Sequence, residues 1–372
     1  MRTKILYLGL LLISALLIVN PDAYCQIIFG QPASADLRMV FTGWSLNYGD
    51  STYEINQLMF PLNGFVPLGE NSEANFYLAN SSNRLNQPVA SHDLSGLSDF
   101  RIQLNRSFLD DQLLLSGGVN LPVGKKKLNS ADQWPVMEFL SRDFLGFPMS
   151  RFGEGFGFNL LIGGARMLGQ FKCGSGITYQ FNGSYKPLAS GPDYNPGDML
   201  SANAGAEWQR NSAKFNADVI GNFYTSDKSA GERNFKQGSQ LDLRVSGLYD
   251  KKSYSFGGSL RYLVRGRNTR YGMNETVSEQ LKIYGNEFGA SGRISLVFNE
   301  WIFSPMGEVR LIAENEENFG NSKIYGFGGS LDKKIGANAA FGFGFEYLTG
   351  NADGGRIDLS GYRLTSHLAA SL

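Results

Sequence analysis

The sequence predicts an all-β fold, a transmembrane antiparallel β-barrel of about 14 to 16 strands with short turns at one end and longer loops at the other. Three observations predict this fold. Apolar and polar residues alternate at period two. The alternating segments run for about 10 to 14 residues, which suits a tilted membrane strand better than an ordinary globular one. The connections between them alternate between tight and long.

The composition excludes several other classes of protein. Of the 372 residues, 18% are charged and 13% are aromatic, which is a poor surface chemistry for a cytosolic enzyme. The 34 basic residues balance 34 acidic ones, whereas a nucleic-acid-binding protein needs a basic surface to neutralise phosphates. The 2 cysteines cannot build a disulfide scaffold or a four-ligand zinc site. We therefore predict no nucleic-acid partner, no metal and no cofactor.

The first residues have the features of a secretory signal peptide. Arg2 and Lys4 precede an apolar run over residues 5–19, which is too short to span a bilayer comfortably. Cleavage after Cys25 would remove residues 1–25 as the signal. Lipidation of Cys25 is the less favoured alternative, because the preceding Asp-Ala-Tyr lacks the small and aliphatic residues that normally stand before a lipid-modified cysteine.

The remaining residues, 26–372, are predicted to form one domain, with 26–36 as a short periplasmic segment before the first strand. No apolar run among them approaches the roughly 20 residues that a membrane helix needs. Two alternatives remain for an exported chain of this kind: a soluble periplasmic or secreted protein, or a barrel surrounded by lipid in the outer membrane of a Gram-negative cell.

The alternation itself is clearest in two segments. Every second residue from Phe156 to Ile162 is apolar, and every second residue from Phe341 to Tyr347 is aromatic. The residues between them are small or polar, as in Gly344 and Glu346. A soluble sandwich alternates too, with its polar face outside, whereas a membrane barrel turns its apolar face to lipid and its polar face to the lumen.

Charged residues on the polar face are predicted to point into the lumen. Because their signs balance, we favour ion pairs that hold neighbouring strands together over a selectivity field across a pore, which stays the alternative. Pairs two residues apart, such as Asp242 and Arg244, would lie on one face of a strand. The predicted lumen charges are Asp99, Arg101, Glu207, Asp218, Asp242, Arg244, Arg261, Arg293, Glu308 and Arg310.

The connections set the strand count. An even count places both ends of the barrel wall in the periplasm. The alternation gives about 16 strands if the first hairpin, residues 37–66, is included and about 14 if it is not. The tight turns lie near residues 109–111, 168–171, 209–212, 249–252, 299–300 and 334–336. The long connections are 85–97, 124–154, 186–197, 225–238, 265–282, 314–321 and 349–356.

The connection 124–154 is the best candidate for a functional site, because it is far too apolar to extend freely into water. It is predicted to fold over or into the barrel mouth and to offer an apolar pocket to a small hydrophobic ligand. The alternative is that it only packs on neighbouring loops or extends the barrel wall. The candidate ligand-binding residues are Trp134, Met137, Phe139, Leu140, Phe144 and Phe147.

No sequence motif indicates catalysis, and we predict that the chain is not an enzyme. His92 and His367 are far apart in sequence, and His367 is expected to be a structural lumen residue. His92 stands between Ser91 and Asp93 in a predicted external loop, but sequence neighbours seldom form a catalytic triad.

Two segments resemble a known family. Residues 96–128 read GLSDFRIQLNRSFLDDQLLLSGGVNLPVGKKKL, and a later segment reads Tyr194-Asn195-Pro196-Gly197-Asp198. They resemble outer-membrane barrels of the phenol-degradation meta-pathway group, which is related to the long-chain fatty acid transporter superfamily. The start at Gln26 resembles exported proteins of Bacteroidota. The chain departs from the fatty-acid transporters at residues 31–35, where Gln-Pro-Ala-Ser-Ala replaces their Asn-Pro-Ala hatch motif.

The resemblance implies a barrel that lets small hydrophobic molecules pass passively through the outer membrane. The alternative function is a barrel without transport, which anchors a secretion or surface-assembly machinery and binds a protein partner through its external loops.

Overall fold

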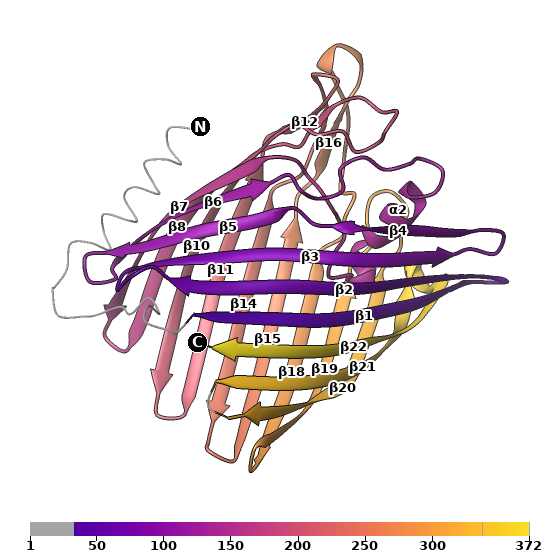
Figure 1. Cartoon of the computed structure of the whole chain (residues 1–372). Coiled ribbons are helices and arrows are strands. Elements are labelled where there is room, and N and C mark those ends of the chain that lie inside the picture. Colours follow the sequence, from indigo (N-terminus) through magenta and orange to yellow (C-terminus); the bar gives the residue numbers. More distant parts are fainter. Residues whose placement is uncertain (1–32, 337, 372) are drawn as a thin grey trace.

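The computed structural model describes residues 33–336 and 338–371 and shows a closed antiparallel β-barrel (Figure 1). One sheet contains 17 strands, all paired antiparallel to strands beside them in the barrel wall. β4 and β5 follow one another along the same partner, β3, so the wall has 16 strand positions. β1 pairs with β22 from Ser34 opposite Ser371 onward, which closes the barrel. The predicted fold is confirmed, with the larger of the two strand counts.

The first half of the wall runs from β1 (Ser34–Tyr48) to β8. Its other members are β2 (Ser51–Pro67), β3 (Ser72–Asn86), β4 (Ser91–Leu97), β5 (Phe100–Phe108), β6 (Leu113–Leu121), β7 (Gly157–Leu168) and β8 (Phe171–Asn182). The second half comprises β10 (Met199–Arg210), β11 (Ala213–Tyr224), β14 (Gln240–Asp250), β15 (Tyr254–Arg265), β18 (Glu287–Phe298), β19 (Trp301–Ile312), β20 (Ser322–Ile335), β21 (Ala339–Ala352) and β22 (Ile357–Ser371).

The long connections carry structure of their own. A second sheet of 5 short strands forms from them, with β9 (Tyr194–Asn195), β12 (Ser226–Ser229), β13 (Glu232–Lys236), β16 (Asn268–Tyr271) and β17 (Val277–Leu281). The connection after β6 contains the helix α2 (Trp134–Leu140) and the 3₁₀ turn η1 (Asp143–Leu145). Two further 3₁₀ turns are η2 (Met273–Glu275) and η3 (Asp353–Gly355). No helix in the described part of the chain is both long and apolar enough to cross a membrane.

The alternation of residues places apolar side chains outside and polar ones inside. On β21, Phe343 and Tyr347 point outward and are 48% and 47% exposed, whereas Glu346 points inward and is 3% exposed. In a soluble sheet protein these apolar side chains would form the core, whereas here they cover the outer surface of the barrel. This is the arrangement of a barrel that faces lipid.

The structure decides two sequence-based expectations about the first strands. The first hairpin, 37–66, belongs to the wall as β1 and β2. Residues 85–97 are not a long loop, because β3 runs to Asn86 and β4 begins at Ser91, so His92 lies on a strand. Leu85 pairs with His92 and Asn83 pairs with Leu94, and this pairing extends the hairpin beyond the point where polarity suggested a loop. Leu85 and Leu94 are both buried. The predicted signal peptide, residues 1–25, lies outside the described residues.

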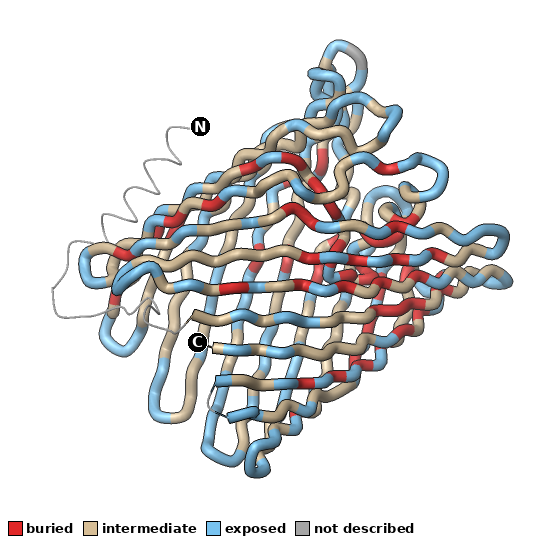
Figure 2. Tube along the Cα trace, in the orientation of Figure 1, coloured by how far each residue is buried: buried red, intermediate tan, exposed pale blue. Residues whose placement is uncertain are grey.

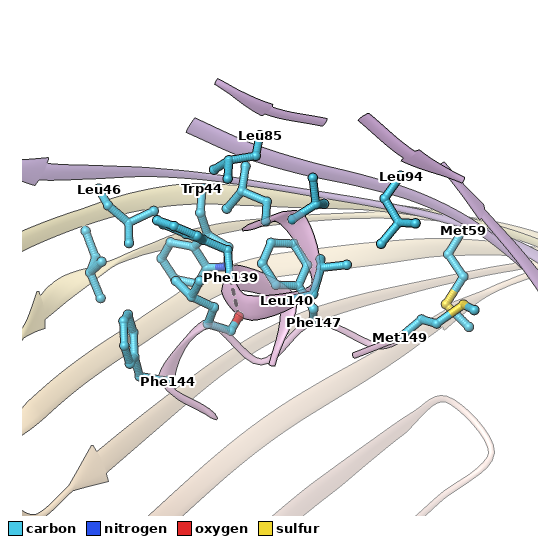
Figure 3. Packing of buried hydrophobic residues seen from close by; sticks show 14 of the residues in the cluster. Trp44, Leu46, Met59, Leu85, Leu94, Phe139, Leu140, Phe144, Phe147 and Met149 are labelled. Atoms are coloured by element: carbon cyan, nitrogen blue, oxygen red, sulfur yellow. Dashed lines mark hydrogen bonds between the residues drawn. The ribbon is translucent and has the colours of Figure 1, made fainter. Parts of the chain in front are cut away.

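A hydrophobic core fills one side of the barrel at the long-loop end. Figure 2 shows the buried residues gathered around α2, and Figure 3 shows their packing. We call residues 124–154 the inserted segment, because they fold back into the barrel instead of extending from it. The wall contributes inward-facing side chains of β1–β4 and β20–β22, among them Trp44, Leu46, Ile55, Met59, Leu85, Leu94, Ile324, Leu348, Ile357 and Leu359.

Candidate functional site

Asp99 holds both ends of the inserted segment. It lies between β4 and β5, where the pairing register with β3 shifts by one residue and the strand is interrupted. Its Oδ1 accepts a hydrogen bond from the backbone N–H of Gly124 at 2.9 Å, and its Oδ2 accepts one from the N–H of Glu154 at 2.7 Å. The Asn120 side chain donates a third at 3.0 Å. These donors satisfy a carboxylate that is only 3% exposed.

Side-chain contacts fix the inserted segment against the apolar wall. The Trp44 indole N–H donates to the carbonyl of Leu145 at 2.9 Å. The fully buried Gln57 amide both donates to the carbonyl of Met149, at 2.7 Å, and accepts from its N–H, at 3.1 Å. Each bond satisfies a backbone group that a buried, irregular segment would otherwise leave without a partner.

Ion pairs tie the inserted segment to the opposite wall. Asp143 pairs with Arg265 at 2.9 Å, and its carbonyl accepts a hydrogen bond from Arg310 at 3.0 Å. Glu287 pairs with both arginines, at 3.3 and 3.2 Å. Burial raises the pKa of the Asp143 carboxyl, and the guanidinium of Arg265 acts in the opposite direction. The segment therefore crosses the lumen from the β1–β3 wall to β15 and β19.

Gly146 makes the close approach of Arg310 possible. Its φ of 61° lies in the left-handed region, and a Cβ there would meet the Arg310 Nη1 at 2.7 Å. A larger residue would carry both the conformational strain and the clash.

The predicted ligand-binding residues divide into two groups. Phe139, Leu140, Phe144 and Phe147 are at most 8% exposed and pack into the core (Figure 3). Tyr53 stacks on Phe139, for example, with ring centroids 5.7 Å apart. Trp134 and Met137 instead line a cavity.

We call this cavity the mouth pocket. It has a volume of about 380 Å³ and lies between the inserted segment and the connection after β8. Tyr185 and Tyr194 form one side, with their rings in edge contact at 5.8 Å. Burial raises the pKa of Tyr185 to about 12 and also raises the pKa of Tyr194, so both are neutral phenols at physiological pH. The pocket is lined by Lys125, Lys126, Leu128, Trp134, Met137, Ser141, Ser150, Arg151, Phe152, Gly153, Tyr185, Pro187 and Tyr194.

A second cavity, the inner chamber, lies on the other side of residues 150–152. It has a volume of about 570 Å³ and is lined by polar side chains of β2, β3 and β5, including Asn75, Tyr77 and Arg101. Ser150, Arg151 and Phe152 line both cavities and therefore form the partition between them. Arg151 is 67% exposed in this space and pairs with Glu154 at 2.7 Å.

The rest of the lumen is open and charged. Glu207 pairs with Lys214 at 2.6 Å, and Asp242 pairs with Arg244 and Arg261 at 2.7 and 2.9 Å. Cavities of about 500 and 630 Å³ lie along this wall, and Glu207, Asp218, Arg293 and Glu308 are among the residues that line them.

The predicted pairs two residues apart do not all form. Asp242 and Arg244 do pair, but Asp99 binds backbone N–H groups and Arg310 turns to Glu287. The Arg101 guanidinium lies 5.9 Å from the centre of the Tyr77 ring. Asp99 lies between two strands, and the other predicted lumen charges sit on the lumen face of their strands.

Sequence reasoning missed Arg151, Phe152, Tyr185 and Tyr194. Arg151 and Phe152 belong to the connection 124–154, but they stand between Ser150 and Gly153, beyond its apolar run, so the pattern did not indicate them. Nothing in the sequence indicates that the tyrosines, from the next connection, would meet Phe152 across the mouth.

No protein-family model matches the chain, and no curated protein sequence matches it at a significant level. Among solved structures, the CymD monoaromatic hydrocarbon channel is 12% identical, with a TM-score of 0.44 and coverage of 92% of this chain and 89% of that one. A TodX mutant monoaromatic hydrocarbon channel is 9% identical, with a TM-score of 0.49 and coverage of 92% and 91%. OpdQ of Pseudomonas aeruginosa is 11% identical, with a TM-score of 0.45 and coverage of 93% and 100%. At these values the likeness extends to the barrel alone, so any substrate has to be argued from the residues of this chain.

Proposed function

We propose that the protein is an outer-membrane channel for passive passage of small molecules, and that its mouth pocket receives solutes with an apolar part. The exposed apolar outer wall supports a membrane location. Bacterial barrels place short turns in the periplasm and long loops outside, which puts the mouth pocket at the external end.

One observation carries the channel function: the inserted segment leaves part of the charged lumen wall uncovered. Beside it, inward-facing cations of β14, β15 and β18 remain exposed, with Arg244 51%, Arg261 41% and Arg293 50% accessible to solvent. A barrel filled by its own segment would bury these side chains, and burying charged groups is costly. Their exposure supports a water-filled passage beside the segment.

The lining of the mouth pocket supports a preference for solutes with an apolar part. Trp134, Phe152 and the two tyrosines surround it, and aromatic side chains offer large apolar contact areas with few polar groups to desolvate. The volume of about 380 Å³ falls within the usual range of small-molecule sites.

Reconstitution in lipid vesicles tests this function. We expect ion conductance in planar bilayers, and faster vesicle swelling with phenyl β-D-glucoside than with methyl β-D-glucoside. The double variant Trp134→Ala/Met137→Ala should lose that preference and keep its conductance. Trp301→Ala, on the outer wall, is the matched control and should behave as the unmodified protein.

A closed barrel would give neither conductance nor swelling and would contradict the proposal. A stoichiometric protein partner retained through gentle extraction would then favour the anchor function.

A further inference from the structure

The inner chamber has a row of side chains that comes from three neighbouring strands. The register pairs Asn63 of β2 with Tyr77 of β3, and Tyr77 with Arg101 of β5. Directly paired residues share one face of a sheet, with Cβ atoms roughly 4.5–5.5 Å apart. The row therefore presents an amide, a phenol and a guanidinium to the same space.

Arg101 is a cation with no acidic partner among the described residues. Its guanidinium lies over the Tyr77 ring, 5.9 Å from the ring centre, and its side chain is exposed to the chamber. The two carboxylates that line the chamber are both engaged elsewhere. Asp99 accepts hydrogen bonds from Gly124 and Glu154, and Glu154 pairs with Arg151.

Neutral hydrogen-bonding groups surround this cation. The Asn63 amide makes no side-chain hydrogen bond within the described residues, and Asn75 donates only to Glu73, at 3.2 Å. Gln103 uses its amide N–H groups on Asn105 and Ser116, which leaves its carbonyl oxygen for other donors. Such amides can bind hydroxyl groups as donors and as acceptors.

We propose that the inner chamber binds a small hydroxylated organic acid, with its carboxylate on Arg101 and its hydroxyl groups on the amides of Asn63, Asn75 and Gln103. The planar guanidinium can hold both oxygens of a carboxylate, and stacking on Tyr77 keeps it in place. The chamber volume of about 570 Å³ accommodates a monosaccharide-sized molecule.

This site rests on the proposed function, because a solute reaches the chamber only if the lumen is open. It goes beyond that function by assigning a charge preference to the passage. Arg151 lines both cavities, so the same carboxylate would meet a second guanidinium at the partition.

Ligand-observed NMR on the detergent-solubilised full-length protein tests the site with D-glucuronate and D-glucose as probes. These differ by a carboxylate at one carbon. We expect glucuronate to bind at least about tenfold more tightly than glucose, as a charge-assisted hydrogen-bonded pair allows. Arg101→Gln should remove that difference. Arg106→Gln is the matched control, because Arg106 lies on the outer face of the same strand over Phe108 and should leave the difference unchanged.

Equal binding of the two sugars by the unmodified protein would overturn the proposal, and so would undiminished glucuronate binding by Arg101→Gln. Heat-modifiable migration on gels shows that each variant is a folded barrel. Bilayer conductance of the same samples reports the channel function separately. Conductance with no carboxylate preference would reject the binding site alone, whereas carboxylate binding without conductance would reject the channel alone.

Discussion

Asp99 and Glu154 lie 55 residues apart in the sequence and are joined by a hydrogen bond of 2.7 Å from the Glu154 N–H to the Asp99 carboxylate. The other carboxylate oxygen holds Gly124, so one side chain fixes the entry and the exit of the inserted segment. The width of the lumen therefore depends on an acidic residue at a strand interruption.

Replacing this carboxylate should loosen the inserted segment without opening the barrel. An asparagine amide has one acceptor oxygen in place of two, so Asp99→Asn would leave a buried N–H without a partner, at a cost of about 1–3 kcal/mol. We expect faster tryptic cleavage after Arg142 and Arg151 and a noisier bilayer current. Asp110→Asn, in a short turn, is the control and should leave both unchanged. Unaltered cleavage in Asp99→Asn would show that the core alone positions the segment.

The indole of Trp44 should contribute to stability through the hydrogen bond of its N–H as well as through the packing of its ring. Trp44→Phe keeps an aromatic ring in the core but leaves the Leu145 carbonyl without this donor, at a cost of about 1 kcal/mol. Urea unfolding in lipid vesicles, followed by circular dichroism, measures the change. Trp301→Phe, on the outer surface, should alter the midpoint less. Equal shifts for the two variants would exclude a specific role for this hydrogen bond.

Gly146 provides a test of the contact with Arg310. Gly146→Ala places a side chain at φ 61° and 2.7 Å from the guanidinium, whereas Gly336→Ala meets a similar φ of 68° with no atom within 4 Å. The strain of a left-handed conformation, roughly 1–2 kcal/mol, is common to both. We expect Gly146→Ala to be the more destabilising and to change conductance, because Arg310 must move. Equal destabilisation by the two variants would mean that the Arg310 side chain moves away from the added methyl group at no measurable cost.

The raised pKa of Tyr185 predicts how the mouth pocket responds to high pH. A phenol whose pKa rises from 10.0 to about 12 on folding is held in its neutral form by the folded state. Its contribution to stability is complete below pH 10 and is lost as the pH rises towards 12. The absorbance difference at the tyrosinate band between the unmodified protein and Tyr185→Phe should titrate near pH 12 when folded. In denaturant the same difference should titrate near pH 10, and titration near 10 in both states would contradict the burial.

Much of the barrel could be predicted from the sequence, because the alternation of apolar and polar residues within each strand distinguishes its two faces. The phenylalanines of 341–345 and the charges of Asp242 and Arg244 need only the period of two to assign lipid and lumen sides. The hairpin with Leu85 and Leu94 was missed because local polarity concealed its buried face.

The site was less predictable, because its geometry depends on contacts between distant residues. The apolar character of 124–154 indicates burial, but not which wall covers it. The position of the segment follows from its contacts with Trp44 and Gln57 on one wall and with Arg265 on the other. Trp44 and Gln57 are each more than 90 residues away in sequence from the residue that they hydrogen-bond. Four predicted ligand-binding residues, Phe139 among them, satisfy this packing instead of lining a pocket.

The makeup of the core also has a consequence for assembly. Phe139 and Phe144 are buried together with Trp44 near one end of the chain and Leu348 near the other. Neither set of strands alone supplies the complete cover, so the aromatic side chains gain full burial only when β1 has met β22. Docking of the segment is thereby coupled to closure of the seam. A barrel caught before that step would leave these aromatic side chains exposed as an apolar patch.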